Sequence, residues 1–354
     1  MPLPRRVTLA RVAEEAGVSV STASRALRGR GDMSADTRAR VLRASAALGY
    51  TFAGESRGRP RDSAAGVIDL VFGHFHDPYT DEVVAGARTA AAVLRHDLVL
   101  TTDRSDAEDD WPHRIRTRGS AGVIVGLMTP TTAQLALMRE AGIRLVLLDP
   151  PSEAHAPLPS IRTTDRVGGA AAADHLIDCG ARRFILIGGT PSYRFGRARV
   201  DGFTSAVRRR APDARVLRVD GDWGAAAAAR AAARALRDLD GHGPIGLFAC
   251  NDEMAAGAYR AIADAGLEVP RDVLVVGFDD VRGARWLHPP LTTIRQPLRE
   301  MGAAAVRMLV RGIEGKEPAA QGVELPTALV VRGSTAHRTG APASSHQPAR
   351  TLEG

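Results

Sequence analysis

The spacing of apolar residues divides the chain into a short helical part and a long alternating part. Residues 8–50 carry apolar side chains three or four positions apart, and from Val67 onward short apolar runs alternate with helical stretches. The first series of runs is GVIDLVF, HDLVLTT, AGVIVGL and IRLVLLD. The second series, after Pro159, is RRFILIGG, ARVLRVDG, PIGLFAC and DVLVVGF. Two such series predict two doubly wound α/β sheets, one in each of two lobes.

The short part predicts three helices. Val12 and Ala16 lie on one face of the first helix, and Gly17 then permits a tight turn. Ser19 and Ser34 are placed to cap the second and third helices. The residues predicted to face inward are Ala23, Ala26, Leu27, Val41, Leu42 and Leu48. Two helices separated by a glycine-containing turn of a few residues are the helix-turn-helix pattern, so this part is predicted to be an all-α headpiece.

The second helix has a polar face opposite its predicted core. Ser21, Ser24 and Arg25 share that face because they are three and four residues apart. Such a helix fits the major groove of DNA, where arginine pairs with guanine and serine hydroxyls contact base edges or phosphates. Val20 is placed to meet a thymine methyl. The alternative is a small helical bundle with a polar surface, which the turn sequence and the local charge disfavour.

The charge of the chain is concentrated in the same region. The formal net charge is +7, and residues 1–62 hold 12 arginines and 6 acidic residues. A basic module on a nearly neutral body predicts a polyanion partner for the module alone, with a solvated basic tail as the alternative. Lys316 is the only lysine, so the preference for arginine extends over the whole chain.

The remaining composition is that of a cytosolic protein. Hydrophobic residues make up 44% and charged residues 25% of the chain, and no apolar run reaches the length of a membrane helix. No signal peptide opens the sequence, and Cys179 and Cys250 form no disulfide framework. We therefore expect a reduced, cytoplasmic location and no contact with a membrane.

Polar and aromatic side chains follow the predicted strands of the long part. Ligands of doubly wound sheets bind outside the carboxyl ends of the strands, and two facing lobes form a cleft that can close on a small molecule. The candidate residues there include Asp77, Tyr79, Asp149, Trp223, Asn251, Asp252 and Asp279. Aromatic faces with carboxylates, an amide and arginine suit a polyhydroxy ligand such as a sugar. The alternative for each is structural, because single tryptophans are often core residues and such aspartates often cap helices.

Signatures of an enzyme are missing from the sequence. It contains no GxGxxG phosphate loop, no GxSxG elbow and no HExxH motif, and it indicates no cofactor. His74 and His76 alternate at a strand end, but two histidines without a third ligand are usually solvent-facing, so no metal is expected. The sequence therefore predicts a binding protein.

The headpiece sequence TLARVAEEAGVSVSTASRAL closely resembles the DNA-binding headpiece of the LacI-type (lactose-repressor) family of bacterial transcription regulators. Further resemblance lies in ACNDEMAAGAYRAIADAGLEVPRDVLVVGFDD and PPLTTIRQP, and the match extends over about residues 8–333. It implies a two-lobed body like that of periplasmic binding proteins. It also implies a regulator, typically a repressor, that binds a two-fold symmetric operator as a homodimer and responds to a small effector. A sugar is the favoured effector, and a nucleobase or a sugar-binding protein without a regulatory role are the alternatives.

The resemblance also assigns individual positions. The implied base-reading residues are Val20, Ser21 and Arg25, and the implied phosphate contacts are Thr8, Ser19, Ser24 and Thr37. The implied effector residues are Tyr79, Arg199, Trp223, Asn251 and Asp279, to which the strand-end pattern adds Asp149.

The predicted domain limits follow from these patterns. The headpiece is 1–50, the hinge or linker 51–65, the two-lobed body 66–333, and a disordered tail 334–354. The first lobe takes about 66–160 and 294–324, and the second about 161–293 and 325–333.

The linker departs from the family pattern. Family members usually form a hinge helix here, with a leucine that wedges into the minor groove, and Arg59 stands at that leucine position. Gly54, Gly58 and Pro60 disfavour a helix. The segment RGRP resembles an AT-hook core, so we expect Arg57 and Arg59 to enter the minor groove as an extended arm. A distorted hinge helix over 53–60 and a passive linker are the alternatives.

Overall fold

The computed structural model describes residues 7–27, 33–48, 50, 66–104, 110–153, 158–239, 243–316 and 322–336. The chain forms two compact units, Met1–Ser63 and Ala64–Gly354, which we call the headpiece and the body. The linker with Arg57 and Arg59 lies outside the described residues.

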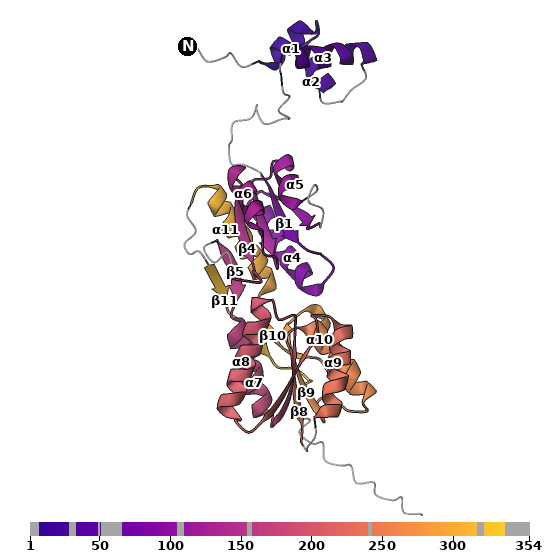
Figure 1. Ribbon diagram of the computed structural model, residues 1–354, viewed down its shortest axis with the longest axis vertical. Coiled ribbons are helices and arrows are strands. Elements are labelled where there is room, and N and C mark those ends of the chain that lie inside the picture. The colour runs from indigo at the N-terminus through magenta and orange to yellow at the C-terminus, as the bar shows by residue number, and fades with distance from the viewer. Residues whose placement is uncertain are drawn as a thin grey trace, which may run out of the picture. The chain divides into compact units, whose positions relative to one another are not determined.

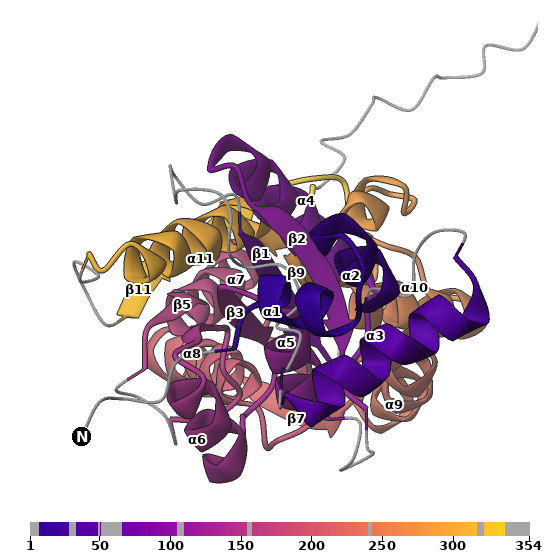
Figure 2. The same ribbon diagram turned by 90° about the horizontal axis from the view of Figure 1, so that it is seen from above.

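Three helices build the headpiece: α1 (Leu9–Glu15), α2 (Val20–Leu27) and α3 (Ala35–Ala47), drawn in indigo in Figures 1 and 2. The predicted caps are confirmed, since Ser19 Oγ accepts the Thr22 amide at 3.2 Å and Ser34 Oγ accepts the Thr37 amide at 3.2 Å. Gly17 has φ +63°, which is the left-handed conformation that the predicted tight turn requires. The helix-turn-helix prediction therefore holds at the level of the backbone.

The three helices enclose a small apolar core. Its fully buried members are Val12, Ala13, Ala16, Ala23, Ala26, Val41 and Ala44. The prediction that Leu42 faces inward is wrong, because its side chain is 50% exposed. Successive helix residues are rotated by about 100°, so a core-facing Val41 turns its neighbour Leu42 toward solvent.

The first lobe of the body is a six-stranded parallel sheet. Its strands are β1 (Val67–Phe72), β2 (Asp97–Thr102), β3 (Gly122–Gly126), β4 (Arg144–Leu148), β5 (Ser160–Thr163) and β11 (Gly322–Leu325). They lie in the order β11-β5-β4-β3-β1-β2, with Val67 of β1 opposite Asp97 of β2. The helices of this lobe are α4 (Pro78–Val93), α5 (Trp111–Arg118), α6 (Thr132–Glu140) and α11 (Leu298–Ile313).

Both faces of this sheet are buried. In β1, Ile68, Leu70 and Phe72 pack in one apolar cluster with residues of α4 and α11. Val71 points the other way and packs with Trp111 of α5 and with α6. Side chains alternate along a strand, so a continuous apolar run is what a sheet with helices on both faces requires.

The second lobe repeats this architecture. Its strands are β6 (Arg183–Gly188), β7 (Arg215–Asp220), β8 (Ile245–Ala249), β9 (Val273–Asp279), β10 (Thr292–Arg295) and β12 (Ala328–Val330), in the order β12-β10-β9-β8-β6-β7. Only the β10–β12 pair is antiparallel among the described strand pairs of this sheet. The helices are α7 (Asp165–Asp178), α8 (Arg194–Arg210), α9 (Ala225–Asp238), α10 (Asp252–Asp264) and the 3-10 turn η1 (Arg282–Arg285).

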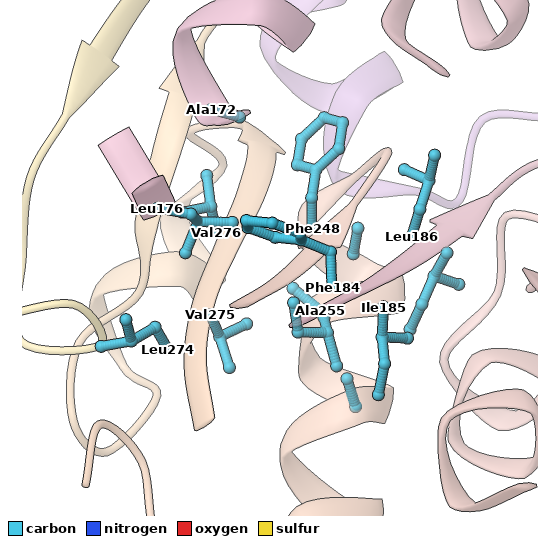
Figure 3. Packing of buried hydrophobic residues seen from close by; sticks show 14 of the residues in the cluster. Ala172, Leu176, Phe184, Ile185, Leu186, Phe248, Ala255, Leu274, Val275 and Val276 are labelled. Carbon is cyan, nitrogen blue, oxygen red and sulfur yellow. The ribbon is translucent and has the colours of Figure 1, made fainter. Parts of the chain in front are cut away.

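The helices of the second lobe also cover both faces of its sheet. Figure 1 shows α7 and α8 on one side of the central strands and α9 and α10 on the other. A large core fills the lobe, with Phe184, Phe203, Phe248 and Phe278 fully buried, and Figure 3 shows part of it. The prediction of two doubly wound sheets is confirmed.

The chain passes between the two sheets three times, after β5, after β10 and after β11. The sequence led us to expect crossings between the lobes at about residues 160/161, 293/294 and 324/325. In the structure β5 continues in the first sheet to Thr163, β10 continues in the second to Arg295, and β11 ends at Leu325. Each crossing therefore comes slightly later than expected, because short polar strands occupy the segments next to it.

The second lobe also extends beyond its expected end at 333. Ser334 is fully buried and its Oγ donates to the Val275 carbonyl at 2.6 Å, while Thr335 is 3% exposed. The expectation of a disordered tail from 334 is therefore wrong for these two residues, because their hydroxyls bond to strands of the lobe. Residues 337–354 lie outside the described part of the chain.

Candidate functional site

The outward face of α2 carries the residues expected to read bases. Val20 is 49% exposed, and Ser21 and Arg25 are also exposed, whereas Ser24 is half-buried. Arg25 is the only basic residue in α2. The helix therefore presents a hydroxyl, a guanidinium and an isopropyl group to the outside, as a helix that reads the major groove must.

Three of the four residues expected to contact phosphates, Thr8, Ser19 and Thr37, lie at helix starts, whereas Ser24 lies within α2. Thr8 is exposed and caps α1, accepting the Arg11 amide at 3.4 Å. Ser19 Oγ lies 2.9 Å from Ser21 Oγ and 2.8 Å from Thr22 Oγ1. Thr37 is in the first turn of α3, with its hydroxyl 2.8 Å from Ser34 Oγ. Each hydroxyl thus has a structural partner in addition to any contact with DNA.

The body contains a cavity of about 470 Å³ between its two lobes. All six residues expected to bind an effector line it: Tyr79, Asp149, Arg199, Trp223, Asn251 and Asp279. Strand order reverses around β1 and β3 in the first sheet and around β6 and β8 in the second. The lining residues follow the carboxyl ends of these strands and their neighbours, the place where doubly wound sheets bind ligands.

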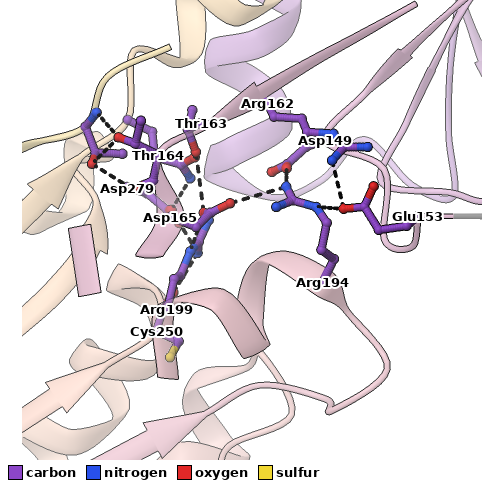
Figure 4. A network of polar contacts seen from close by, with 12 residues as sticks. Asp149, Glu153, Arg162, Thr163, Thr164, Asp165, Arg194, Arg199, Cys250 and Asp279 are labelled. Atoms are coloured by element: carbon purple, nitrogen blue, oxygen red, sulfur yellow. Dashed lines mark hydrogen bonds and ion pairs between the residues drawn. The ribbon is translucent and has the colours of Figure 1, made fainter. Parts of the chain in front are cut away.

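Arg199 lies at the centre of a buried polar network, which Figure 4 shows. Its side chain is 3% exposed, Nε donates to Asp165 Oδ1 at 2.9 Å, and a terminal nitrogen donates to the Cys250 carbonyl at 2.7 Å. The same terminal nitrogen lies 3.6 Å from Asp279 Oδ1. The guanidinium stacks over the ring of Phe278 at 3.8 Å from its centroid. These contacts fix the orientation of the Arg199 guanidinium, a strong hydrogen-bond donor, beside the cavity.

Asp279 is held at the end of β9 in an unusual backbone conformation, with φ +113°. Its Oδ1 accepts from Gln296 Nε2 at 2.7 Å, and Gln296 Oε1 in turn accepts from Thr163 Oγ1 at 2.7 Å. Burial raises the pKa of Asp279 to about 7, against the opposing charge of Arg199. Burying a carboxylate costs free energy unless it accepts hydrogen bonds, and the hydroxyl groups of a ligand can donate them.

Asp149 connects the two lobes. It follows β4 of the first lobe, and its Oδ1 accepts from Arg194 of α8 in the second lobe at 3.1 Å. Arg194 also donates to Asp165 at 3.3 Å and lies 3.8 Å from Glu153 of the first lobe. Tyr79 donates its hydroxyl to Asp149 Oδ2 at 3.4 Å. Burial, reinforced by the neighbouring Asp165 carboxylate, raises the pKa of Asp149 to about 7.

Three aromatic rings form one wall of the cavity. Trp223 lies 5.2 Å from Phe195 and 5.9 Å from Tyr193, measured between ring centroids. Gly189 lies against the indole, since a Cβ at Gly189 would be 2.1 Å from it. Asn251 caps α10 through its side-chain oxygen and donates its amide to the Trp223 carbonyl at 3.0 Å. The ring expected to stack on an effector is therefore fixed on several sides.

Sequence reasoning missed Asp165, Arg194 and Gln296, which connect the expected site residues. Asp165 follows the polar strand β5, whose sequence gave no apolar signal. Arg194 is the first residue of α8, which follows β6 and from which only Arg199 was predicted, and Tyr193 and Phe195 lie beside it. The available signal was the position of this segment after the buried strand β6, where ligand-binding loops are expected.

Among the described residues, no three His, Cys, Asp or Glu side chains are grouped so that they could hold a metal ion. In the same part of the chain, no helix has both the length and the apolar character needed to cross a membrane.

Comparison with known proteins adds direct evidence. Residues 8–51 match the family of bacterial regulatory proteins called the lacI family, and residues 173–335 match the periplasmic binding protein-like domain. The chain is 35% identical over 350 residues to the HTH-type transcriptional regulator reg1 of Streptomyces lividans, covering 94% of this chain and 97% of the relative. It is 31% identical to the lactose operon repressor of Escherichia coli (strain K12), covering 93% and 91%.

Solved structures agree with these relatives. The complex of the transcriptional regulator CelR with cellobiose has a TM-score of 0.68 and 29% identity, covering 93% of this chain and all of that one. The lac repressor dimer bound to operator and the anti-inducer ONPF has a TM-score of 0.68 and 28% identity, covering 94% and 99%. The headpiece, the two-lobed body and this likeness along nearly the whole length lead to one conclusion: the chain belongs to the lacI family of bacterial regulatory proteins and is a DNA-binding transcription regulator.

Proposed function

We propose that this regulator is a repressor that binds a two-fold symmetric operator as a homodimer in the cytoplasm, and that a small sugar between its lobes controls operator affinity. The observation that carries the sugar proposal is the cavity, which is lined by the buried Asp149, Arg199 and Asp279 together with the aromatic ring of Trp223. Carboxylates and a guanidinium bind sugar hydroxyls, and the ring packs on the apolar face of a sugar.

On the DNA side, α2 enters the major groove. Arg25 pairs with guanine, Val20 and Ser21 contact neighbouring base edges, and four hydroxyl groups contact phosphates. The phosphate contacts are Thr8, Ser19, Ser24 and Thr37. Two headpieces on two half-sites require a dimer, which is the assembly named for the lac repressor structure on its operator.

On the effector side, a ligand that bridges the lobes changes their relative setting and so the state of the headpieces. The structure of CelR with cellobiose supports a sugar as the ligand. A nucleobase would use the same aromatic ring but would leave the buried carboxylates with fewer hydroxyl partners. A thermal-shift screen of sugars and nucleobases separates the two, because a ligand of the native state raises its apparent melting temperature.

Two variants test the effector site. Trp223→Ala and Asp279→Asn should abolish the effector response while operator affinity stays nearly unchanged, because stacking and hydrogen bonding to the effector are lost at the cavity alone. Calorimetry with the sugar found in the screen, together with gel shifts on the operator, provides the measurement. Asp264→Asn, an exposed change on α10 away from the cavity, is the control. If both variants kept the effector affinity of the unaltered protein, the assignment of the effector site to this cavity would be wrong.

A further inference from the structure

The cavity has two levels of polar groups that differ in burial. At its base, Asp149, Arg199 and Asp279 are between 1% and 7% exposed. Toward solvent, the cavity is lined by the exposed residues His74, His76, Asp222 and Glu253. A single sugar ring that satisfies the base would leave the outer level facing water.

Two rings of the aromatic wall lie in different planes. Phe195 is 7% exposed, and its centroid lies 5.2 Å from that of Tyr193 and 5.2 Å from that of Trp223, so the three rings pack against one another. The planes of Tyr193 and Trp223 are at 83° to each other, and both rings line the cavity. One flat ring cannot stack on two faces at such an angle, whereas two sugar rings joined by a bent glycosidic bond can.

Outer polar groups are available for a second ring. The side chain of Glu253 makes no hydrogen bond or ion pair with the part of the chain that the structure describes, although it lies in the first turn of α10 at the cavity. His76 has only a ring contact with His74, at 4.5 Å between centroids, within the same described residues. An acceptor and a ring nitrogen without other partners match the hydroxyls of a sugar.

We propose that the effector is an oligosaccharide of at least two rings. The inner ring binds Asp149, Arg199 and Asp279 and stacks on Trp223, as the proposed function requires. The outer ring packs on Tyr193 and makes hydrogen bonds to His76 and Glu253. A cavity of about 470 Å³ lies within the range of about 300–1,000 Å³ that is usual for pockets of drug-sized ligands, so it has room for more than one sugar ring. The inference rests on the proposed sugar response and specifies the size of the sugar.

The test is calorimetric titration of the full chain with glucose, galactose, mannose and ribose, and with maltose, cellobiose and lactose. We expect at least one disaccharide to bind about tenfold or more tightly than either of its component rings, which corresponds to about 1.4 kcal/mol from the added contacts of the second ring. A monosaccharide that binds as tightly as every disaccharide would overturn the inference and leave the sugar response intact. Failure of all the sugars to bind would instead overturn the proposed function.

Variants of the residues proposed to bind the outer sugar ring provide a second test. Tyr193→Ala and Glu253→Gln should each weaken the disaccharide about fivefold to tenfold and leave the affinity for the component monosaccharide unchanged. Glu253→Gln is a change at an exposed residue, so it tests the idea even if Tyr193→Ala alters the packing of Trp223. His113→Ala, at an exposed position of α5 outside the cavity, is the control. Equal losses for both sugars, or none, would show that no outer subsite exists.

Discussion

At the scale of single residues, the proposed base contact of Arg25 gives a direct prediction. Arg25→Ala should cost about 1–3 kcal/mol of binding at the preferred operator, because one bidentate contact to a base is lost while most phosphate contacts remain. Gel-shift titrations on operator and scrambled DNA at one salt concentration measure the specific and the non-specific affinity. Arg234→Ala, an exposed arginine on α9 of the body, is the control for loss of charge. Equal weakening on both DNA sequences would make Arg25 a phosphate contact instead.

The buried carboxylates predict a pH dependence of effector binding. In the free protein, burial raises the pKa of both Asp149 and Asp279 to about 7. Sugar hydroxyls that donate to these groups favour the ionised form and lower the pKa, so binding releases protons. Affinity should therefore increase as the pH rises from 6 to 8 and level off above that range. Calorimetry at pH 7 in buffers of different ionisation enthalpy measures the protons released.

Asp149→Asn removes one of the two titrating groups. In this variant the pH dependence of the remaining affinity should become shallower, whereas Asp264→Asn, at an exposed residue outside the cavity, should leave it unchanged. Proton uptake on binding to the unaltered protein would contradict the assignment of hydroxyl donors to these carboxylates.

At the scale of elements, helix pairs in the body approach so closely that glycine is required between them. A Cβ at Gly202 of α8 would lie 2.0 Å from the Arg166 carbonyl oxygen of α7, and one at Gly169 of α7 would lie 2.1 Å from the Arg199 carbonyl oxygen. This contact places Arg199 of α8 opposite Asp165 at the start of α7. The packing of two helices thus positions the centre of the cavity's polar network.

Gly202→Ala should therefore destabilise the body by about 1–3 kcal/mol, because α7 and α8 must separate to admit the methyl group. Gly312→Ala is the matched control, since its new Cβ would meet only Arg144 at 4.0 Å and alanine favours a helix over glycine. Denaturant unfolding of both variants gives the comparison. If Gly202→Ala were as stable as Gly312→Ala, the close helix contact would not be important for the fold.

The elements that sequence predicted are those with a strong local signal. The central strands carry apolar runs that are almost entirely buried, because helices cover both faces of their sheets: β1, β3, β6, β8 and β9. The four missed strands, β5, β10, β11 and β12, are three or four residues long and lie at sheet edges or next to the lobe crossings. Their pairing depends on residues far away in the chain, which local periodicity does not report.

The same division applies to the candidate site. Trp223, Asn251 and Asp279 follow predicted strands, so a rule about strand ends locates them. Arg194 and Gln296 were not predicted, because their importance lies in contacts made across the lobes, to Asp149 and to Thr163. Such contacts appear only when the two sheets are placed together.

At the scale of the whole body, the two lobes are tied by ion pairs of different burial. Arg194, 14% exposed, reaches the 1% exposed Asp149, whereas Arg282 of the second lobe meets Glu82 of the first with its own side chain 72% exposed. The exposed pair is weakly stabilising because water and salt screen it. Asp149 also lines the effector cavity, so a ligand bound there acts on the group that holds the lobes together.

The connection between headpiece and body remains a prediction from sequence. Residues 51–65 contain RGRP in place of the family's helix and leucine, and Arg57 and Arg59 are expected to lie in the minor groove as an extended arm. In that case Arg57→Ala/Arg59→Ala should release up to about two fewer counterions per subunit when the protein binds its operator. The plot of log affinity against log salt concentration should become flatter accordingly.

A matched pair separates this effect from a change in net charge. Arg230→Ala/Arg234→Ala removes the same charge from exposed positions of α9 in the body, and its salt slope should equal that of the unaltered protein. Contacts to phosphates and to the groove release counterions, whereas distant charges do not. Only the linker variant should therefore show a weaker dependence of affinity on salt concentration. An unchanged slope and affinity in Arg57→Ala/Arg59→Ala would show that the segment is a passive linker, and DNA contact would then belong to the headpiece helices alone.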